Sequence, residues 1–250
     1  MIRLVINWAP LSGDRAQRQQ NAWNAIESLM ATNEDFVATT VVCPGDPVED
    51  APRLHGILTK KVGNRNLPFV GDIMDHARSM AEDDDWIGFL NSDVIPTQRF
   101  IDRIRSSDKK FVMCNVTDID EYGAGVRYRP PRGGSIDGVF TKSSTWGDIR
   151  VSVPDLVLGS RAWDTAFVLW SFRHLDSSEW FLQSECLHIL HGYEHWASEN
   201  DEACRLNTAA LNPHGGLAAA ASLFRRNRAK KIGKPHRRIG PKKTRLKKRR

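Results

Sequence analysis

The chain has 250 residues and a formal net charge of +6, and it is long enough to bury the core of one α/β domain and to carry an appendage. Its charge is unevenly distributed. Residues 225–250 hold 15 of the 36 Lys and Arg residues and no Asp or Glu, which leaves 21 basic and 30 acidic side chains in residues 1–224. We therefore expect an acidic folded domain over residues 1–224 and a basic, disordered tail over residues 225–250.

Composition also argues against several classes of protein. No apolar stretch has the length of a membrane span, and the opening MIRLVINWAP lacks the long apolar core of a secretion signal. The cysteines are far apart, without the paired spacing of metal knuckles or of a disulfide framework: Cys43, Cys114, Cys186 and Cys204. We expect a soluble cytoplasmic protein with reduced thiols, and the sequence leaves its oligomeric state open.

The first half of the chain alternates predicted strands with predicted helices. Apolar runs bounded by turn residues predict five strands, over residues 3–8, 36–43, 54–59, 86–90 and 111–116. Helical periodicity predicts three helices, one capped by Asp14, one with Pro68 in its first turn, and one capped by Thr97. Strands that alternate with helices imply an α/β fold whose sheet is mainly parallel and flanked by helices.

The second half is less regular. Residues 121–138 are rich in Gly, Pro and Arg and predict a loop, either a lid on the acceptor side or an ordinary insertion. A strand-like run over residues 155–159 precedes a predicted helix over residues 161–173, which Ser160 would cap. A further ordered stretch covers residues 187–190. A last core helix follows the capping pair Ser198 and Asp201 and carries Ala203, Leu206 and Ala210.

The most specific motif is Asn91-Ser92-Asp93, directly after the apolar run of residues 86–90. A short buried strand that ends in an acidic tripeptide places a carboxylate at the carboxyl edge of the sheet, where open α/β sheets bind ligands. The surrounding segment, LPFVGDIMDHARSMAEDDDWIGFLNSDVIPTQRFIDRI, resembles the middle of a GT-A type glycosyltransferase, in which a strand ends in an Asp-x-Asp motif. Asn91 replaces the first Asp of that motif. The resemblance covers about residues 1–212 and implies a GT-A-like, Rossmann-like fold.

The resemblance also implies a divalent cation, Mn²⁺ or Mg²⁺, and a nucleotide-sugar donor such as a UDP-sugar. Asp93 would be the first metal ligand, and the alternative is a turn residue that caps the strand end. Members of the family often supply a late His as another ligand. His191 and His195 are the candidates here, and His191 is preferred because it closes the strand-like run; either could instead be a structural histidine.

Other residues would contact the donor or the acceptor. The resemblance places Asn91 and Ser92 at the ribose or diphosphate, the loop of residues 9–14 near the base, and Asp72 and Arg65 in the region that reaches the nucleotide. For the loop, a plain connector is the alternative, and for Asp72 and Arg65 it is a solvated helix face. An inverting enzyme needs a base for the acceptor hydroxyl, and Asp164 has the expected position. Asp164 could equally be an acidic residue that favours the dipole of its helix.

Residues 191–195 also spell H-x-x-E-H, the inverted zincin signature, in which His191 and His195 would bind zinc and Glu194 would activate water. That chemistry requires the five residues to lie on a helix. Gly192, in the middle of the motif, argues against a metallopeptidase.

The tail predicts binding to a phosphate backbone, which releases counterions and depends on salt. Anchoring to anionic lipid or simple solubility is the alternative. The predicted nucleic-acid contacts are Arg225, Arg226, Arg228, Lys230, Lys231, Arg237 and Arg238. With the motif at Asp93, the tail makes the chain similar to phage transferases that place sugars on hydroxymethylated pyrimidines in DNA. A transferase for a cell-envelope glycan at an anionic membrane and a non-catalytic nucleic-acid-binding protein remain open as alternatives.

Overall fold

The computed structural model describes residues 1–63, 66–120, 136–175, 178–181, 185–191, 201–216, 218, 219 and 222. The larger of its two sheets has seven strands in the order β3-β2-β1-β4-β8-β6-β9. These strands are β1 (Ile2–Asn7), β2 (Phe36–Val42), β3 (Leu54–Ile57), β4 (Trp86–Leu90), β6 (Phe111–Cys114), β8 (Gly138–Lys142) and β9 (Ser178–Phe181). All neighbours are parallel except β8, which runs antiparallel to both β4 and β6. The predicted α/β fold with a mainly parallel sheet is confirmed.

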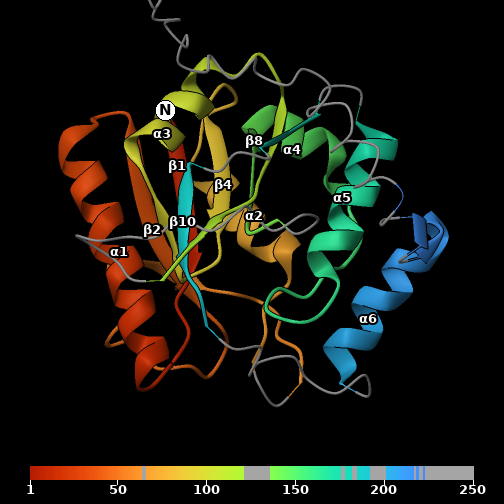
Figure 1. The fold of residues 1–250 in the computed structure, drawn as a ribbon, viewed down its shortest axis with the longest axis horizontal. Coiled ribbons are helices and arrows are strands. Elements are labelled where there is room, and N and C mark those ends of the chain that lie inside the picture. Colours follow the sequence, from red (N-terminus) through yellow and green to blue (C-terminus); the bar gives the residue numbers. More distant parts are fainter. Residues whose placement is uncertain are drawn as a thin grey trace, which may run out of the picture.

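Helices cover both faces of this sheet (Figure 1). One face carries α1 (Asp14–Thr32) and α3 (Gln98–Ser106), whose apolar sides share one core cluster with β1, β2 and β4. The other face carries α2 (Val70–Ser79), α4 (Ser143–Ile149), α5 (Trp163–His174) and, outermost, α6 (Glu202–Leu211). The sheet is therefore buried on both sides, as a parallel sheet requires.

Strand β4 illustrates why a continuous apolar run is needed at the centre of the sheet. Its first and last residues join the cluster beneath α1 and α3, whereas Ile87 and Phe89 join the cluster beneath α2 and α5. The position between them is Gly88, where an added Cβ would lie 2.3 Å from Cδ1 of Phe140. The side-chain alternation of a strand thus buries all five residues, and only glycine leaves room for β8 beside β4.

A second sheet of three strands joins the first where β4 ends. Its strands are β5 (Val94–Pro96), β7 (Thr117–Ile119) and β10 (Cys186–Ile189), in the order β5-β10-β7. The central strand β10 is antiparallel to β5 and parallel to β7. The turn of residues 91–93 leads the chain from β4 directly into β5, and the backbone N–H of Val94 donates to the carbonyl of Asn91 at 3.0 Å. The predicted motif therefore lies between the two sheets.

Two helices begin later than the sequence predicts. Pro68 lies outside α2, because residues 68–70 pair with residues 156–158: the Val70 N–H donates to the Leu156 carbonyl at 2.8 Å. The strand-like run of residues 155–159 therefore forms an isolated bridge to this segment, and it is no strand of either sheet. Helix α5 begins at Trp163, with Ala162 at the cap position in a left-handed conformation, so Ser160 does not cap it.

The capping predictions are corrected elsewhere as well. Gly13 occupies the cap position of α1, and Asp14 is the first helical residue. Thr97 does occupy the cap position of α3, but its hydroxyl donates to the Glu185 carbonyl at 2.6 Å and so ties α3 to the start of β10. Asp201 stands at the cap of α6 without a side-chain cap bond.

The packing of α6 also differs from the prediction. Leu206 is 37% exposed, and the neighbouring Asn207 is buried instead. The Asn207 side chain accepts from the Val157 N–H at 2.7 Å and donates to the Val157 carbonyl at 3.0 Å. This amide satisfies both backbone groups of a buried residue outside any strand, which explains why a polar side chain takes the inward position.

Several predictions fall outside the described residues. They concern residues 121–135 of the predicted loop, Arg65, His195, the rest of the H-x-x-E-H motif, and the tail. Within the part of the chain that the structure describes, no helix combines the length and the apolar character that crossing a membrane requires.

Candidate metal centre

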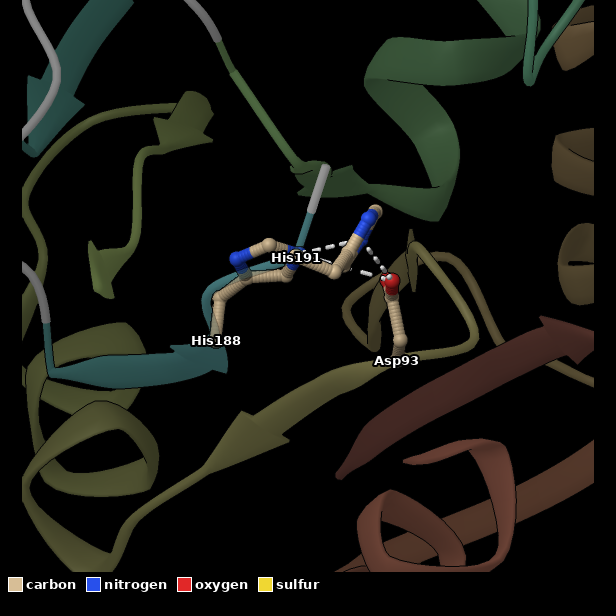
Figure 2. Close-up of side chains that lie close together, drawn as sticks. All are labelled: Asp93, His188 and His191. Atoms are coloured by element: carbon tan, nitrogen blue, oxygen red, sulfur yellow. Dashed lines mark hydrogen bonds and ion pairs between the residues drawn. The ribbon is translucent and has the colours of Figure 1, made fainter. Parts of the chain in front are cut away.

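Three side chains converge at the junction of the two sheets: Asp93, His188 and His191 (Figure 2). The Nε2 atoms of the two imidazoles lie 3.2 Å apart. Oδ2 of Asp93 lies 3.4 Å from Nε2 of His188 and 3.3 Å from Nε2 of His191. The three ligand atoms thus form a nearly equilateral triangle.

Strand pairing explains why these residues meet. Asp93 is the last residue of the turn between β4 and β5, and the next residue, Val94, pairs with His188 across the antiparallel β5–β10 ladder. On β10, His188 alternates with partly buried neighbours and shares its buried face with Cys186. His191 follows the end of β10, and Leu190 is held by a 2.9 Å bond from its N–H to the Ile119 carbonyl.

The triangle fits a divalent cation. Ligand atoms about 2.1 Å from a common ion are about 3.0 Å apart in octahedral geometry and about 3.4 Å apart in tetrahedral geometry. The observed separations of 3.2–3.4 Å lie within that range. Two imidazoles and one carboxylate suit Mn²⁺ or a later transition metal better than Mg²⁺, which prefers oxygen ligands. Asp93 and His191 were predicted as ligands, and the structure adds His188.

The same contacts shift the ionisation of the triad. Burial would raise the pKa of Asp93, but hydrogen bonds and charges from His188 and His191 outweigh it and hold that pKa well below its usual range. Burial would lower the pKa of His188, but the bonds and charges of Asp93, with Asp118 and Asp137 adding to them, raise it. Asp93 is therefore a carboxylate at neutral pH.

Asn91 and Ser92 lie beside the triad, and both are partly exposed. The Asn91 amide donates to Oδ1 of Asp137 at 3.0 Å, and its backbone N–H donates to the Asp137 carbonyl at 2.8 Å. Asn91 replaces the first acidic residue of the motif, and its amide binds the carboxylate of Asp137, the residue before β8. The sequence gives no sign of this pairing, because the two residues are 46 positions apart.

A cavity of about 670 Å³ opens next to His191. One wall is formed by Ser12 and the beginning of α1, with Asp14, Arg15, Gln17, Arg18 and Asn21, and the other is formed by residues 189–191. The Arg18 Nε atom is buried without a hydrogen-bond partner among the described residues. A second cavity, of about 180 Å³, lies between residues 8–11, α1 and the loop after β2. The predicted ligand loop of residues 9–14 thus contributes to the walls of both cavities.

The remaining predicted residues lie in different surroundings. Asp72, in the first turn of α2, is 8% exposed and accepts a hydrogen bond from the Thr59 hydroxyl at 2.9 Å. Asp164 is in the first turn of α5, next to Trp163, whose ring centroid lies 5.7 Å from that of Phe89 near the carboxyl end of β4. Burial raises the pKa of Asp164 to about 6. Neither residue belongs to the triad, so their functional roles stay predictions.

No protein-family model matches this chain, and no curated protein does either. Among solved structures, it is similar to the glycosyltransferase GlyE of Streptococcus pneumoniae TIGR4, at 13% identity and a TM-score of 0.38 over 94% of this chain and 65% of that one. The apo form of GlyE matches at 14% identity and a TM-score of 0.38, over 92% of this chain and 63% of that one. The chain spans less than two thirds of the length of these structures.

Proposed function

We propose that the protein is a metal-dependent glycosyltransferase that uses a nucleotide-sugar donor. The observation that carries this proposal is the triangle of Asp93, His188 and His191 at the carboxyl end of β4, beside a polar cavity. Ligand sites of open α/β sheets lie at this edge. A cation site without a neighbouring cavity would favour a structural metal, whereas here His191 belongs to both.

The chemistry follows from the donor. Breaking the bond between the anomeric carbon and the diphosphate leaves negative charge on the departing nucleotide. A bound divalent cation supplies Lewis-acid neutralisation of that charge. Asp93, His188 and His191 would hold the cation, and Asn91 and Ser92 would donate or accept hydrogen bonds at the ribose or diphosphate.

The cavity supports an anionic donor. Arg15 and Arg18 are three residues apart on α1 and both line it, so their side chains share one side of the helix. The positive end of the α1 dipole lies at the same wall. The Arg18 Nε atom, which is buried and has no hydrogen-bond partner among the described residues, would gain an acceptor from a phosphate oxygen. These features favour a nucleoside diphosphate over a neutral ligand.

Acceptor activation is the role we propose for Asp164. A carboxyl group with a pKa of about 6 takes a proton from a hydroxyl more readily than an ordinary carboxylate does. This role applies if the enzyme inverts the anomeric configuration. A retaining enzyme would not need the base.

The acceptor that we propose is a hydroxymethylated pyrimidine in DNA, held near a catalytic domain of residues 1–224 by the basic tail. Support for this finer step comes from the sequence alone, from 15 cationic and no anionic side chains in residues 225–250. Tethering would raise the local concentration of the acceptor and leave its selection to the pocket.

One experiment tests both levels of the proposal. The full chain is incubated with Mn²⁺ and a panel of nucleotide sugars, with plain DNA, hydroxymethylated DNA or no acceptor, and nucleoside diphosphate release and nucleoside masses are measured. Release with any donor supports glycosyl transfer, and a hexose or pentose added to a nucleoside supports the DNA acceptor. Absence of release with every donor, although DNA still binds, would instead favour a non-catalytic nucleic-acid-binding protein. Salt-sensitive pelleting with anionic vesicles but not with DNA would favour a membrane-associated acceptor.

A further inference from the structure

A second carboxylate, Asp118 on β7, stands behind the metal triad. Its Oδ1 lies 3.0 Å from Nδ1 of His188, which is the ring nitrogen that does not face Asp93. Asp118 is 4% exposed and His188 is 6% exposed. This contact is thus among the most deeply buried polar contacts of the site.

Strand register sets this contact. Asp118 and His188 are partners across the parallel β7–β10 ladder, so their side chains leave the small sheet on the same face. Across the opposite ladder of β10, His188 pairs with Val94, the residue after Asp93. His188 is therefore held from two neighbouring strands, by Asp118 at Nδ1 and by the turn of the motif at Nε2.

The contact determines which ring nitrogen is available to a cation. An ionised carboxylate only accepts hydrogen bonds, so Nδ1 of His188 must carry a proton to bond with Asp118. In the neutral ring the lone pair is then on Nε2, which points at Asp93 and His191. The other tautomer would place a hydrogen at the ligand position and exclude a metal.

We propose that Asp118 is the positioning residue of the cation site, and that it fixes His188 in the tautomer and orientation that metal binding requires. This inference rests on the proposed metal-dependent function. An amide side chain would make a purely structural hydrogen bond to His188 equally well. Such a bond would not require a carboxylate that is buried behind a metal ligand. Carboxylates behind metal-bound histidines also raise the basicity of the ring, and their loss weakens metal binding about 10–100-fold.

The test compares Asp118→Asn with wild-type protein and with Asp108→Asn. Asp108 is a matched control, since its side chain is 82% exposed and its ion pair is with the adjacent Lys109. Mn²⁺ affinity is measured without donor or acceptor, by calorimetric titration of the full chain, and folding is verified by circular dichroism. We expect a 10–100-fold loss of affinity in Asp118→Asn and no loss in Asp108→Asn. Affinity within about twofold of wild type in folded Asp118→Asn would overturn the inference.

A second measurement needs no folded Asp118 variant. The ¹⁵N shifts of the His188 ring, assigned by comparison with His188→Gln, report the tautomer in metal-free wild-type protein above the pKa of the ring. We expect a protonated Nδ1 and an unprotonated Nε2, and the reverse tautomer would overturn the inference. If the proposed function is wrong, the result is different. The wild-type protein then binds no Mn²⁺, while the ring shifts still show the His188 tautomer that Asp118 fixes.

Discussion

Replacing Asp164 with Asn should make the protein more stable and less active. Asp164 is in the first turn of α5, and burial raises its pKa to about 6 from an ordinary value of 3.8. Ionisation of Asp164 is therefore less favourable in the folded state than in the unfolded chain. A neutral amide of the same shape removes that cost and can still accept from the Thr165 hydroxyl, which lies 3.3 Å from Oδ1 of Asp164.

The magnitude follows from the shift of about two pKa units, at about 1.4 kcal/mol per unit. Because the folded pKa lies above the unfolded one, stability is greatest when the group is protonated and falls as the pH rises through both values. The ionised group lowers the free energy of unfolding by about 3 kcal/mol near pH 8 and by about 1.5 kcal/mol near pH 5. These are upper limits, since water reaches part of the Asp164 side chain.

Urea unfolding of wild type and Asp164→Asn at the two pH values measures this difference. We expect the variant to gain about 1–3 kcal/mol near pH 8 and about half as much near pH 5, while turnover falls by about 100-fold or more if Asp164 is the base. If Asp164 only interacts favourably with the helix dipole, the sign is opposite, and the variant loses about 0.3–1 kcal/mol of its free energy of unfolding. A variant that is destabilised near pH 8 would therefore refute the reasoning.

Three further predictions concern the motif, the tail and the core. Asp93→Ala should lower nucleoside diphosphate release by about 100-fold or more while circular dichroism is unchanged, because one of three cation ligands is lost; release at the wild-type rate would contradict the metal model. Truncation after Phe224 should weaken DNA binding and flatten its dependence on salt by about 0.9 logarithmic units per lost phosphate contact, and an unaltered slope would place the contact in residues 1–224. Gly88→Ala should lower the thermal midpoint and cost about 1–3 kcal/mol or more, since a Cβ there lies 2.3 Å from Phe140; an unchanged midpoint would show that β8 can move away from β4.

The sequence predicts the parallel strands best. Strand β4 matches its prediction at both ends, because five consecutive apolar residues are typical of a strand buried on both faces. Strand β8 was missed: it follows a long stretch rich in Gly and Pro, and its five residues pair antiparallel with β4 on one side and β6 on the other. Helix starts were shifted where tertiary pairing decided them, as at Pro68.

The candidate site was predicted from local patterns and completed by long-range pairing. Asp93 was found because it ends a recognisable strand, and His191 because it ends another. His188 lies within the apolar run of β10, where a single polar residue is hard to distinguish from a structural one. Its pairing with Val94 and Asp118 depends on strand register over 94 and 70 residues of sequence, which no local pattern encodes. Alternation of Cys186 and His188 on one buried face was the available signal.

The claim on which the function depends is that Asp93, His188 and His191 bind one cation. Electron spin echo spectroscopy of the full chain titrated with Mn²⁺ tests it directly, because it counts the nitrogen ligands of the bound ion. We predict one tightly bound Mn²⁺ coupled to two imidazole nitrogens in wild type, one coupled nitrogen in His188→Gln, and greatly weakened binding in Asp93→Ala. Bound Mn²⁺ without nitrogen coupling, or no binding at millimolar concentration, would contradict the account.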